Sequence, residues 1–208
     1  MYQKRNEMDK KWPLTKKGTK YIVRALDNSS LPLLIALRDM LKLGKNRNEV
    51  KEILKTEKIK VNGKVIKNER YPLSLFDVLT TDKDNYKLSI SEKRKYFLEK
   101  ISEKETEEKI AKIINKKMLK NGIQINLSDG RNYIIKEKAK TGDSAVISLK
   151  ENKIKGFLEL KEGARVLVTG GKHIGKKGVI KKLIKKDKEI AELDSKLNVW
   201  TKNIIVVK

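Results

Sequence analysis

The chain has 208 residues, and 51 Lys and Arg against 27 Asp and Glu give it a formal net charge of +24. It contains no cysteine and a single histidine, His173, which excludes a disulfide framework, a thiolate metal site and a multi-histidine zinc centre. No segment approaches the roughly 18 to 20 consecutive apolar residues of a membrane span, and the amino-terminal segment lacks the apolar core of a signal peptide. We therefore expect a soluble intracellular protein with no membrane partner, no metal and no cofactor.

The excess of positive charge favours a polyanionic partner, and nucleic acid is the commonest one. Residues 1–70 carry +11, residues 71–160 carry +5 and residues 161–208 carry +8, so the ends are the basic parts. Lys outnumbers Arg by 43 to 8, which favours contact with backbone phosphates over bidentate reading of bases. Genome composition or growth at high temperature could produce the same Lys bias, and the sequence does not separate these causes.

Residues 1–30 have no hydrophobic period and end in the turn-like segment 27–30, so the sequence predicts an extended basic arm. Lysines interleaved with aromatic residues suit a strand of RNA, where Lys meets phosphate and a ring stacks on an exposed base. The alternative is a solvated tail whose Trp12 packs back on the body. The candidate RNA-binding residues of the arm are Lys10, Lys11, Trp12, Lys16, Lys17, Lys20, Tyr21 and Arg24.

Two short helices and a hairpin are predicted next. Apolar residues from Leu33 to Leu41 follow helical spacing, with Gly44 as the expected carboxyl-terminal cap, and Asn46-x-x-Glu49 resembles a capping box that opens a second helix. Asn62-Gly63, between short apolar runs, is a strong hairpin signal. The polar side chains of this segment form either a solvated basic face or an RNA contact. The candidate RNA-binding residues are Arg38, Lys42, Lys45, Asn46, Arg47, Lys51, Lys55, Lys60, Asn62 and Lys64.

The middle of the chain predicts a small β-rich domain that carries one helix. Strands are expected over 75–79 and 86–90, with a plausible domain junction in the turn-rich segment between them. Ser102-x-x-Glu105 resembles a second capping box, followed by a helix with Ile110, Ile113 and Ile114 on one face. Further strands are expected over 123–127, 133–135 and 145–149, with turns at 121–122 and 129–130.

The last segment predicts a small antiparallel barrel, with a glycine-rich loop after the strand 165–169. Residues 170–176 fit the first seven positions of the phosphate-loop pattern GxxxxGK[ST], but Lys177 replaces the hydroxyl residue and a β-type run follows where a helix is needed. We therefore interpret the loop as a basic hairpin tip. The expected RNA-binding residues are Lys172, His173, Lys176 and Lys177, and Gly170, Gly171, Gly175 and Gly178 are expected to let the loop approach an RNA backbone closely.

Taken together and in order, these segments resemble the archaeal and eukaryotic small-subunit ribosomal protein family S4e. The residues that carry the resemblance span nearly the whole chain: Trp12-Pro13-Leu14, 17–21, 32–34, 37–43, 46–54, 61–65, Tyr71-Pro72-Leu73, Asp77-Val78, 127–132, 141–144, 168–172, Gly175 and Gly178. The helix-hairpin segment alone also resembles parts of pseudouridine synthases and tyrosyl-tRNA synthetases. The last loop resembles the KOW motif of transcription elongation factors.

The resemblance implies an α+β protein of several modules, no catalysis, and a structural role in the cytoplasmic small ribosomal subunit. The expected modules are a basic arm (1–30), an αL-type RNA-binding domain (31–80), a central family-specific domain (81–160) and a KOW-bearing, SH3-like β-barrel (161–208). The expected partners are small-subunit ribosomal RNA, also through Arg131, and neighbouring ribosomal proteins, with no small-molecule substrate. An RNA-modifying enzyme and a KOW-bearing transcription factor remain as alternatives.

Overall fold

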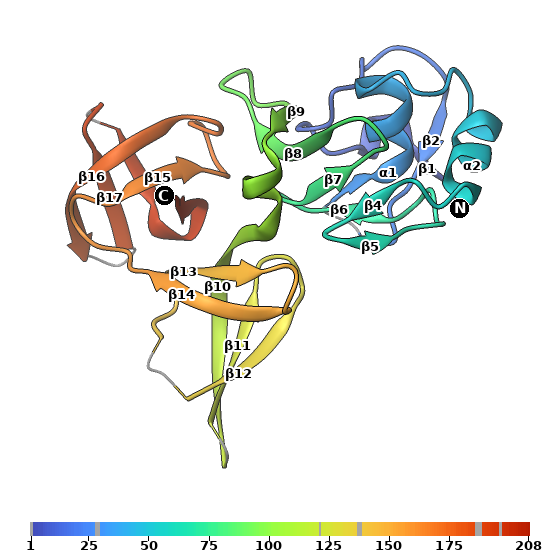
Figure 1. Cartoon of the computed structure of the whole chain (residues 1–208). Helices are drawn as coiled ribbons and strands as arrows, with labels where there is room; N and C mark the ends of the chain where they lie inside the picture. The colour runs from blue at the N-terminus through green and yellow to red at the C-terminus, as the bar shows by residue number, and fades with distance from the viewer. Residues whose placement is uncertain (1, 28–29, 121, 137–138, 186–188, 196) are drawn as a thin grey trace. The chain divides into compact units, whose positions relative to one another are not determined.

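The computed structural model describes residues 2–27, 30–120, 122–136, 139–185, 189–195 and 197–208. The chain divides into two compact units, residues 1–106 (unit 1) and residues 107–208 (unit 2). In both units the described residues are mostly antiparallel strands with a few short helices, as Figure 1 shows. The sequence predicted an α+β protein, and the structure contains both helices and strands, with strands making up most of it.

The described residues of unit 1 form one five-stranded sheet, two two-stranded ladders and several short helices. The sheet has the order β5-β4-β7-β8-β9, and the ladders are β1-β2 and β3-β6. In chain order the elements are β1 (Tyr2–Lys4), η1 (Arg5–Glu7), β2 (Tyr21–Val23), β3 (Leu31–Pro32), α1 (Leu33–Ile35), η2 (Ala36–Met40), α2 (Arg47–Lys55), β4 (Lys60–Val61), β5 (Lys64–Val65), β6 (Pro72–Leu73), β7 (Val78–Thr80), β8 (Asn85–Ile90), β9 (Tyr96–Ile101) and, at the boundary, η3 (Glu103–Glu107).

The first predicted helix is α1 continued by the π-helical turn η2, whose Leu41 N–H reaches back to the Ala36 carbonyl at 3.0 Å. Its residues 33–37 are all buried, which accounts for their unbroken apolar run. Gly44 is not the cap that we expected. The left-handed residue after the helix is Lys42, with φ of 55°, while Gly44 packs against Val50, where an added Cβ would lie 3.1 Å from the side chain.

The capping box of the second helix is confirmed. Asn46 is the N-cap of α2, and its side-chain oxygen accepts the Glu49 N–H at 3.0 Å. The Glu49 carboxylate in turn accepts the Lys45 N–H at 2.7 Å, one residue earlier than in the usual reciprocal pair.

The Asn62-Gly63 hairpin is also confirmed, because β4 and β5 pair through Val61 and Lys64 with only these two residues between them. Their φ angles of 51° and 78° are those of a type I′ turn, whose twist matches that of the strands. The strand β4 also pairs with β7, and β7 pairs with β8. The expected junction at residue 80 therefore lies inside one continuous sheet, and the boundary between the compact units falls after Thr106.

The amino-terminal arm is not extended, contrary to our expectation. β1 pairs with β2, and the Arg5 guanidinium donates to the Thr15 and Thr19 carbonyls at 2.8 and 2.7 Å, which closes the segment between the two strands. Trp12 is only 3% exposed and is fixed by the Lys95 ammonium, which donates to its carbonyl. Burial of the large indole ring outweighs the solvation of the surrounding lysines. Of the turn-like segment 27–30, residues 28 and 29 lie outside the described residues.

Unit 2 contains two five-stranded antiparallel sheets, each with its own apolar core. The first has the order β12-β11-β10-β13-β14 and the second the order β18-β17-β16-β15-β19. Their elements are β10 (Glu108–Leu119), β11 (Gly122–Leu127), β12 (Asn132–Ile135), β13 (Ser144–Ser148), β14 (Lys153–Leu158), β15 (Arg165–Val168), β16 (Lys177–Lys185), β17 (Glu189–Leu193), β18 (Asn198–Trp200), η4 (Thr201–Asn203) and β19 (Ile204–Val206).

The helix predicted from the Ser102-x-x-Glu105 pattern is wrong. Only the short 3-10 helix η3 forms, and Ile110, Ile113 and Ile114 belong to the long strand β10. The first half of β10 pairs with β13 and the second half with β11, so residues 109–113 are buried on both faces of the strand. Tertiary pairing of β-branched residues outweighs the local helical spacing.

The strands predicted around residues 125, 134 and 146 are confirmed as β11, β12 and β13. Asn121, of the expected turn at 121–122, lies outside the described residues. In the second sheet, Lys177–Lys185 form strand β16 directly after the glycine-rich loop. A phosphate loop needs a helix there, so the interpretation of this loop as a strand connection is confirmed.

Candidate nucleic-acid interface

The exposed face of α2 forms the first basic surface of unit 1. Lys51 and Lys55, four residues apart on the helix, line an open hollow of about 400 Å³ together with Lys67, Asn68 and Glu69. Lys55 forms an ion pair with Glu52 at 2.8 Å, and the Lys67 ammonium is 2.5 Å from Glu57. All three lysines are exposed, so they can turn toward an approaching phosphate. The sequence predicted Lys51 and Lys55 and missed Lys67, which no helical pattern links to them.

Arg47, predicted to bind RNA, is held by the protein itself. Its Nε atom donates to both oxygens of Glu69, at 2.8 and 2.9 Å, and its Nη1 atom donates to the hydroxyl of Tyr2. Hydrogen bonding to Arg47 lowers the pKa of the buried Glu69 carboxyl. Arg47 therefore ties β1 to the start of α2, and its guanidinium is largely neutralised. The neighbouring loop residues Lys42 and Lys45 are exposed.

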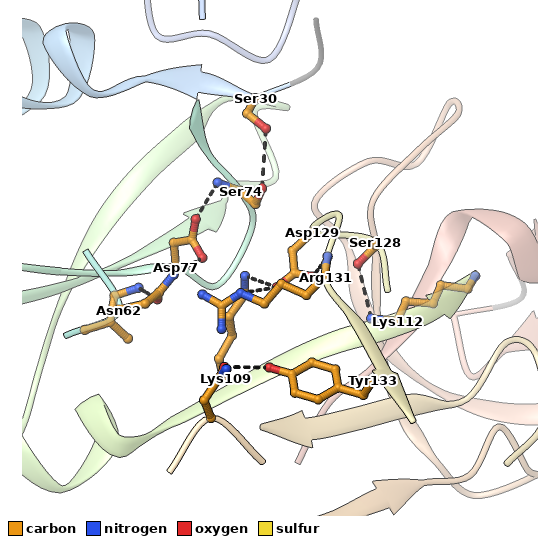
Figure 2. A network of polar contacts seen from close by, with 12 residues as sticks. Ser30, Asn62, Ser74, Asp77, Lys109, Lys112, Ser128, Asp129, Arg131 and Tyr133 are labelled. Carbon is orange, nitrogen blue, oxygen red and sulfur yellow. Dashed lines mark hydrogen bonds and ion pairs between the residues drawn. The ribbon is translucent and has the colours of Figure 1, made fainter. Parts of the chain in front are cut away.

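The hairpin of unit 1 divides its predicted residues in two groups. Lys60 and Lys64 are exposed, whereas Asn62 is 4% exposed and is not available to RNA. Figure 2 shows its amide turned inward, where it donates to Asp77 at 2.7 Å and accepts the Val78 N–H at 3.0 Å. A left-handed turn residue needs a short polar side chain that can bond locally, which explains Asn at this position without RNA.

The arm presents lysines but not its tryptophan. Lys10, Lys16, Lys17 and Lys20 are exposed, and the Lys20 ammonium lies 5.5 Å from the centre of the exposed Tyr21 ring. Lys11 and Arg24 are half-buried. The buried Trp12 cannot stack on a base, so its assignment to the RNA-binding set is a correction. Arg38 is half-buried beside Asp39, with Nη2 and Oδ2 2.9 Å apart.

In unit 2 the glycine-rich loop joins β15 to β16 and exposes Lys172, Lys176 and Lys177, with His173 half-buried. Two glycines, Gly171 and Gly175, have left-handed φ angles of 80° and 87°. The other two serve internal packing. An added Cβ would lie 2.7 Å from the Asn203 Oδ1 atom at Gly170 and 2.7 Å from the Asp194 Oδ1 atom at Gly178. Close approach by the protein's own side chains therefore accounts for these two glycines.

Arg131 lies beside a buried ion pair. Figure 2 shows Lys109, from β10, and Arg131 converging on Asp129, with Lys109 Nζ 2.6 Å and Arg131 Nε 3.5 Å from the Asp129 Oδ2 atom. Burial would raise the pKa of the Asp129 carboxyl, but the attraction of Lys109 and the hydrogen bonds outweigh it, and the pKa is lowered. Lys109 and Asp129 are nearly inaccessible, while 27% of the Arg131 side chain is exposed.

An exposed ring that the sequence analysis overlooked lies in the second sheet of unit 2. Trp200, in β18, is 48% exposed and pairs with Ile190 of β17. In the sequence Trp200 lies close to the apolar run 204–207, so no local pattern indicates that its ring is exposed.

Among the described residues, no helix is both long and apolar enough to cross a bilayer. In the same part of the chain, no three His, Asp or Glu side chains gather in a group that could hold a metal ion.

The matches to protein families agree with this basic, mostly β architecture. Residues 32–79 match the S4 domain, which is an RNA-binding fold, and residues 82–154 match ribosomal family S4e. The two matches meet within the β7–β8 region. They define the class of the protein, a ribosomal protein with an S4 domain.

Curated relatives identify the family. Small ribosomal subunit protein eS4 of Methanococcus aeolicus is 39% identical over 189 residues, covering 83% of this chain and 77% of the relative. The eS4 protein of Methanocella arvoryzae is 35% identical, covering 86% of this chain and 80% of the relative. The chain belongs to the eS4 family of small ribosomal subunit proteins. This is a family of structural proteins and not of enzymes, as the sequence predicted.

A solved structure shows the same fold. The crystal structure of the 30S ribosomal protein S4e from Thermoplasma acidophilum superposes with a TM-score of 0.78 at 24% identity, covering 87% of this chain and 96% of that chain.

Proposed function

We propose that this protein is a structural component of the cytoplasmic small ribosomal subunit that binds and organises small-subunit ribosomal RNA. Membership of the eS4 family supports a place in the small ribosomal subunit, and the S4 domain supports binding to RNA. The exposed lysines of α2, the hairpin and the arm in unit 1, and of the glycine-rich loop in unit 2, support contacts with several stretches of RNA backbone.

The modules divide this work. Residues 31–80 act as an αL-type RNA-binding module and residues 161–208 as a KOW-bearing, SH3-like barrel. Residues 81–160, which complete the sheet of unit 1 and begin unit 2, act as a family-specific connection. Lysines neutralise phosphates and release counterions, while the folded modules hold separate RNA helices and so favour one assembled RNA structure. Neighbouring ribosomal proteins are the other partners. The observation that carries the proposal is the presence of exposed, predominantly lysine surfaces on both compact units.

A salt titration tests the electrostatic mechanism. If about eight phosphates are contacted, the logarithm of the association constant for small-subunit RNA falls with the logarithm of salt concentration with a slope of roughly −6 to −7. The measurement is filter binding of the full chain to a fragment of small-subunit RNA at several salt concentrations. A slope near zero would contradict the proposal.

The glycine-rich loop can be tested separately. Replacing Lys172, Lys176 and Lys177 with Ala should flatten the salt slope by about 2 to 3 and weaken binding. The matched control replaces Lys150, Lys155 and Lys161 with Ala, which changes the net charge by the same amount. These lysines already form ion pairs with Glu107, Glu108 and Glu159. Equal effects of the two triple variants would remove the loop from the interface.

A further inference from the structure

The far end of the β10–β11 hairpin extends beyond β13 and β14 of the same sheet. The strand β13 pairs only with residues 108–112 of β10, and six of the next seven residues of β10 pair with β11. The change of partner occurs at a bulge, where Ile114 has no direct partner in the register. Figure 1 shows this end of the hairpin as a ribbon that continues past β13 and β14.

Large apolar side chains are exposed at this end. Met118 is 72% exposed, Ile134 of the adjoining β12 is 65% exposed, and the bulged Ile114 is 61% exposed. They lie on both faces of the ribbon: Met118 is paired with Ile123 on one face, and Ile134 is aligned with Gln124 and Lys117 on the other. Leaving such side chains in water is costly, and clusters of them mark interaction surfaces.

The charges of the same segment have one sign. Lys117, on the face of Ile134, and Lys120 are exposed, and between Lys109 and Ser128 the sequence contains no Asp or Glu. It also contains no Arg and no aromatic residue there. The hairpin end thus combines exposed aliphatic side chains on both faces with charges that are all positive.

The exposed Met118 and Ile134 side chains favour a protein over RNA as the partner. Lysines can contact RNA phosphates, but aliphatic side chains gain little from phosphates, and stacking on unpaired bases relies on aromatic rings and Arg, which residues 110–127 lack. Aliphatic side chains gain most from a protein surface that is itself apolar. The exposed Lys117 and Lys120 favour carboxylates at the border of that surface.

We propose that the end of the β10–β11 hairpin, with Met118 and Ile134 as its anchors, docks into an apolar crevice of another small-subunit protein bordered by Asp and Glu. The two-sided ribbon fits a crevice rather than a flat surface. This inference rests on the proposed function, because it places the partner in the same subunit.

Site-directed photo-cross-linking in assembled subunits tests the proposal. A benzophenone amino acid replaces Met118 in the full chain, and the control replaces Val65, an exposed apolar residue of the other hairpin. Small subunits are purified by sedimentation, irradiated, and the adducts are digested with nuclease or protease before mass spectrometry. We expect a protease-sensitive adduct, absent from the control, with one small-subunit protein at a peptide next to Asp or Glu residues.

The other outcomes overturn the proposal and are distinguishable. A nuclease-sensitive adduct would assign the hairpin end to RNA, an adduct with a second copy of the chain would indicate self-association, and no adduct above the control would mean that nothing covers the hairpin. In these three cases the chain still sediments with the subunit, and the proposed function stands. Absence of the chain from the subunit would contradict both.

A double substitution gives an independent readout. Met118→Thr with Ile134→Thr keeps residues that suit strands, leaves the charge unchanged and removes the anchors. Retention on subunits through a high-salt wash should fall roughly tenfold or more, with binding to isolated small-subunit RNA unchanged. The control is Val65→Thr. Equal retention of the double variant and the control would contradict docking, and a matching loss of RNA binding would indicate RNA as the partner.

Discussion

At the scale of single residues, two buried lysines of β10 are accommodated in different ways. Lys109 forms an ion pair with the equally buried Asp129. The Lys112 ammonium instead donates to the carbonyls of Thr201 and Lys202 in the 3-10 turn η4, at 2.6 and 2.9 Å. Lys109 thus depends on charge neutralisation, and Lys112 depends on hydrogen bonds to backbone carbonyls. The two residues should therefore respond differently to substitution and to pH.

Asp129→Asn should strongly destabilise the protein, because Lys109 then keeps its buried charge without the carboxylate. We expect a loss of about 3 to 5 kcal/mol in the free energy of unfolding, measured by urea denaturation. The control Glu159→Gln, at an exposed ion pair, should change it by less than about 1 kcal/mol. Adding Lys109→Met to Asp129→Asn should restore much of the loss. A single variant as stable as the control would contradict this account.

Lys112 should make stability depend on pH. Burial, and to a smaller extent the charge of Lys202, lower its pKa from 10.5 to about 8. Below pH 8 both states carry the proton and the cost of the buried charge is present in full. Between pH 8 and 10.5 the unfolded chain binds a proton that the folded chain has released, so stability rises with pH, by about 3 kcal/mol in total.

The comparison with Lys112→Met isolates this effect, because other titrations cancel in the difference. The free energy of unfolding of the parent protein minus that of the variant should rise between pH 8 and 10.5 and stay level below pH 8. A difference that is independent of pH across this range would show that Lys112 keeps its ordinary pKa.

At the scale of elements, the Asn62-Gly63 hairpin depends on the buried Asn62 amide. Asn62→Ala removes the hydrogen bonds to Asp77 and to the Val78 N–H. It also places at a left-handed φ a residue whose side chain cannot form the local hydrogen bonds that let Asn adopt this conformation. We expect a loss of about 2 to 4 kcal/mol, measured by thermal or urea unfolding. Asn48→Ala, on the exposed surface of α2, is the control and should stay within about 0.5 kcal/mol. An equal effect at both positions would contradict the role of Asn62.

Local patterns predicted the elements whose signals are local. The Asn62-Gly63 turn and the Asn46 cap depend on neighbouring residues, and both formed as predicted. The predicted helix at Ile110 and Ile113 is wrong because the burial of these residues depends on pairing with β13 and β11. Those strands are distant in the sequence, so a local pattern does not reveal them. For the candidate site, the exposed lysines could be predicted, whereas the burial of Trp12 and the pairing of Arg47 with Glu69 depend on contacts that only the folded chain creates.

At the scale of the whole molecule, the two tryptophans report on different compact units. Trp12 is buried in unit 1 and Trp200 is half-exposed in unit 2. Trp200→Phe leaves Trp12 as the single reporter of unit 1. In that background, Asp129→Asn should leave the urea midpoint of Trp12 fluorescence unchanged. The part of the circular dichroism signal of the whole chain that unit 2 contributes should be lost at a lower urea concentration. A common shift of both signals would mean that the units unfold as one.

The proposed contact of the glycine-rich loop with RNA depends on how the backbone of the loop is held. Its backbone is fixed internally. The Val168 N–H donates to the Lys176 carbonyl at 2.9 Å, the Gly175 N–H donates to the Val168 carbonyl at 2.8 Å, and Asn203 and Asp194 fill the space beside Gly170 and Gly178. Only lysine side chains then remain to be ordered on contact, so the entropic penalty of association is small. We expect the rate of first encounter at this loop to follow ionic strength through electrostatic steering, without a slower rearrangement of the backbone.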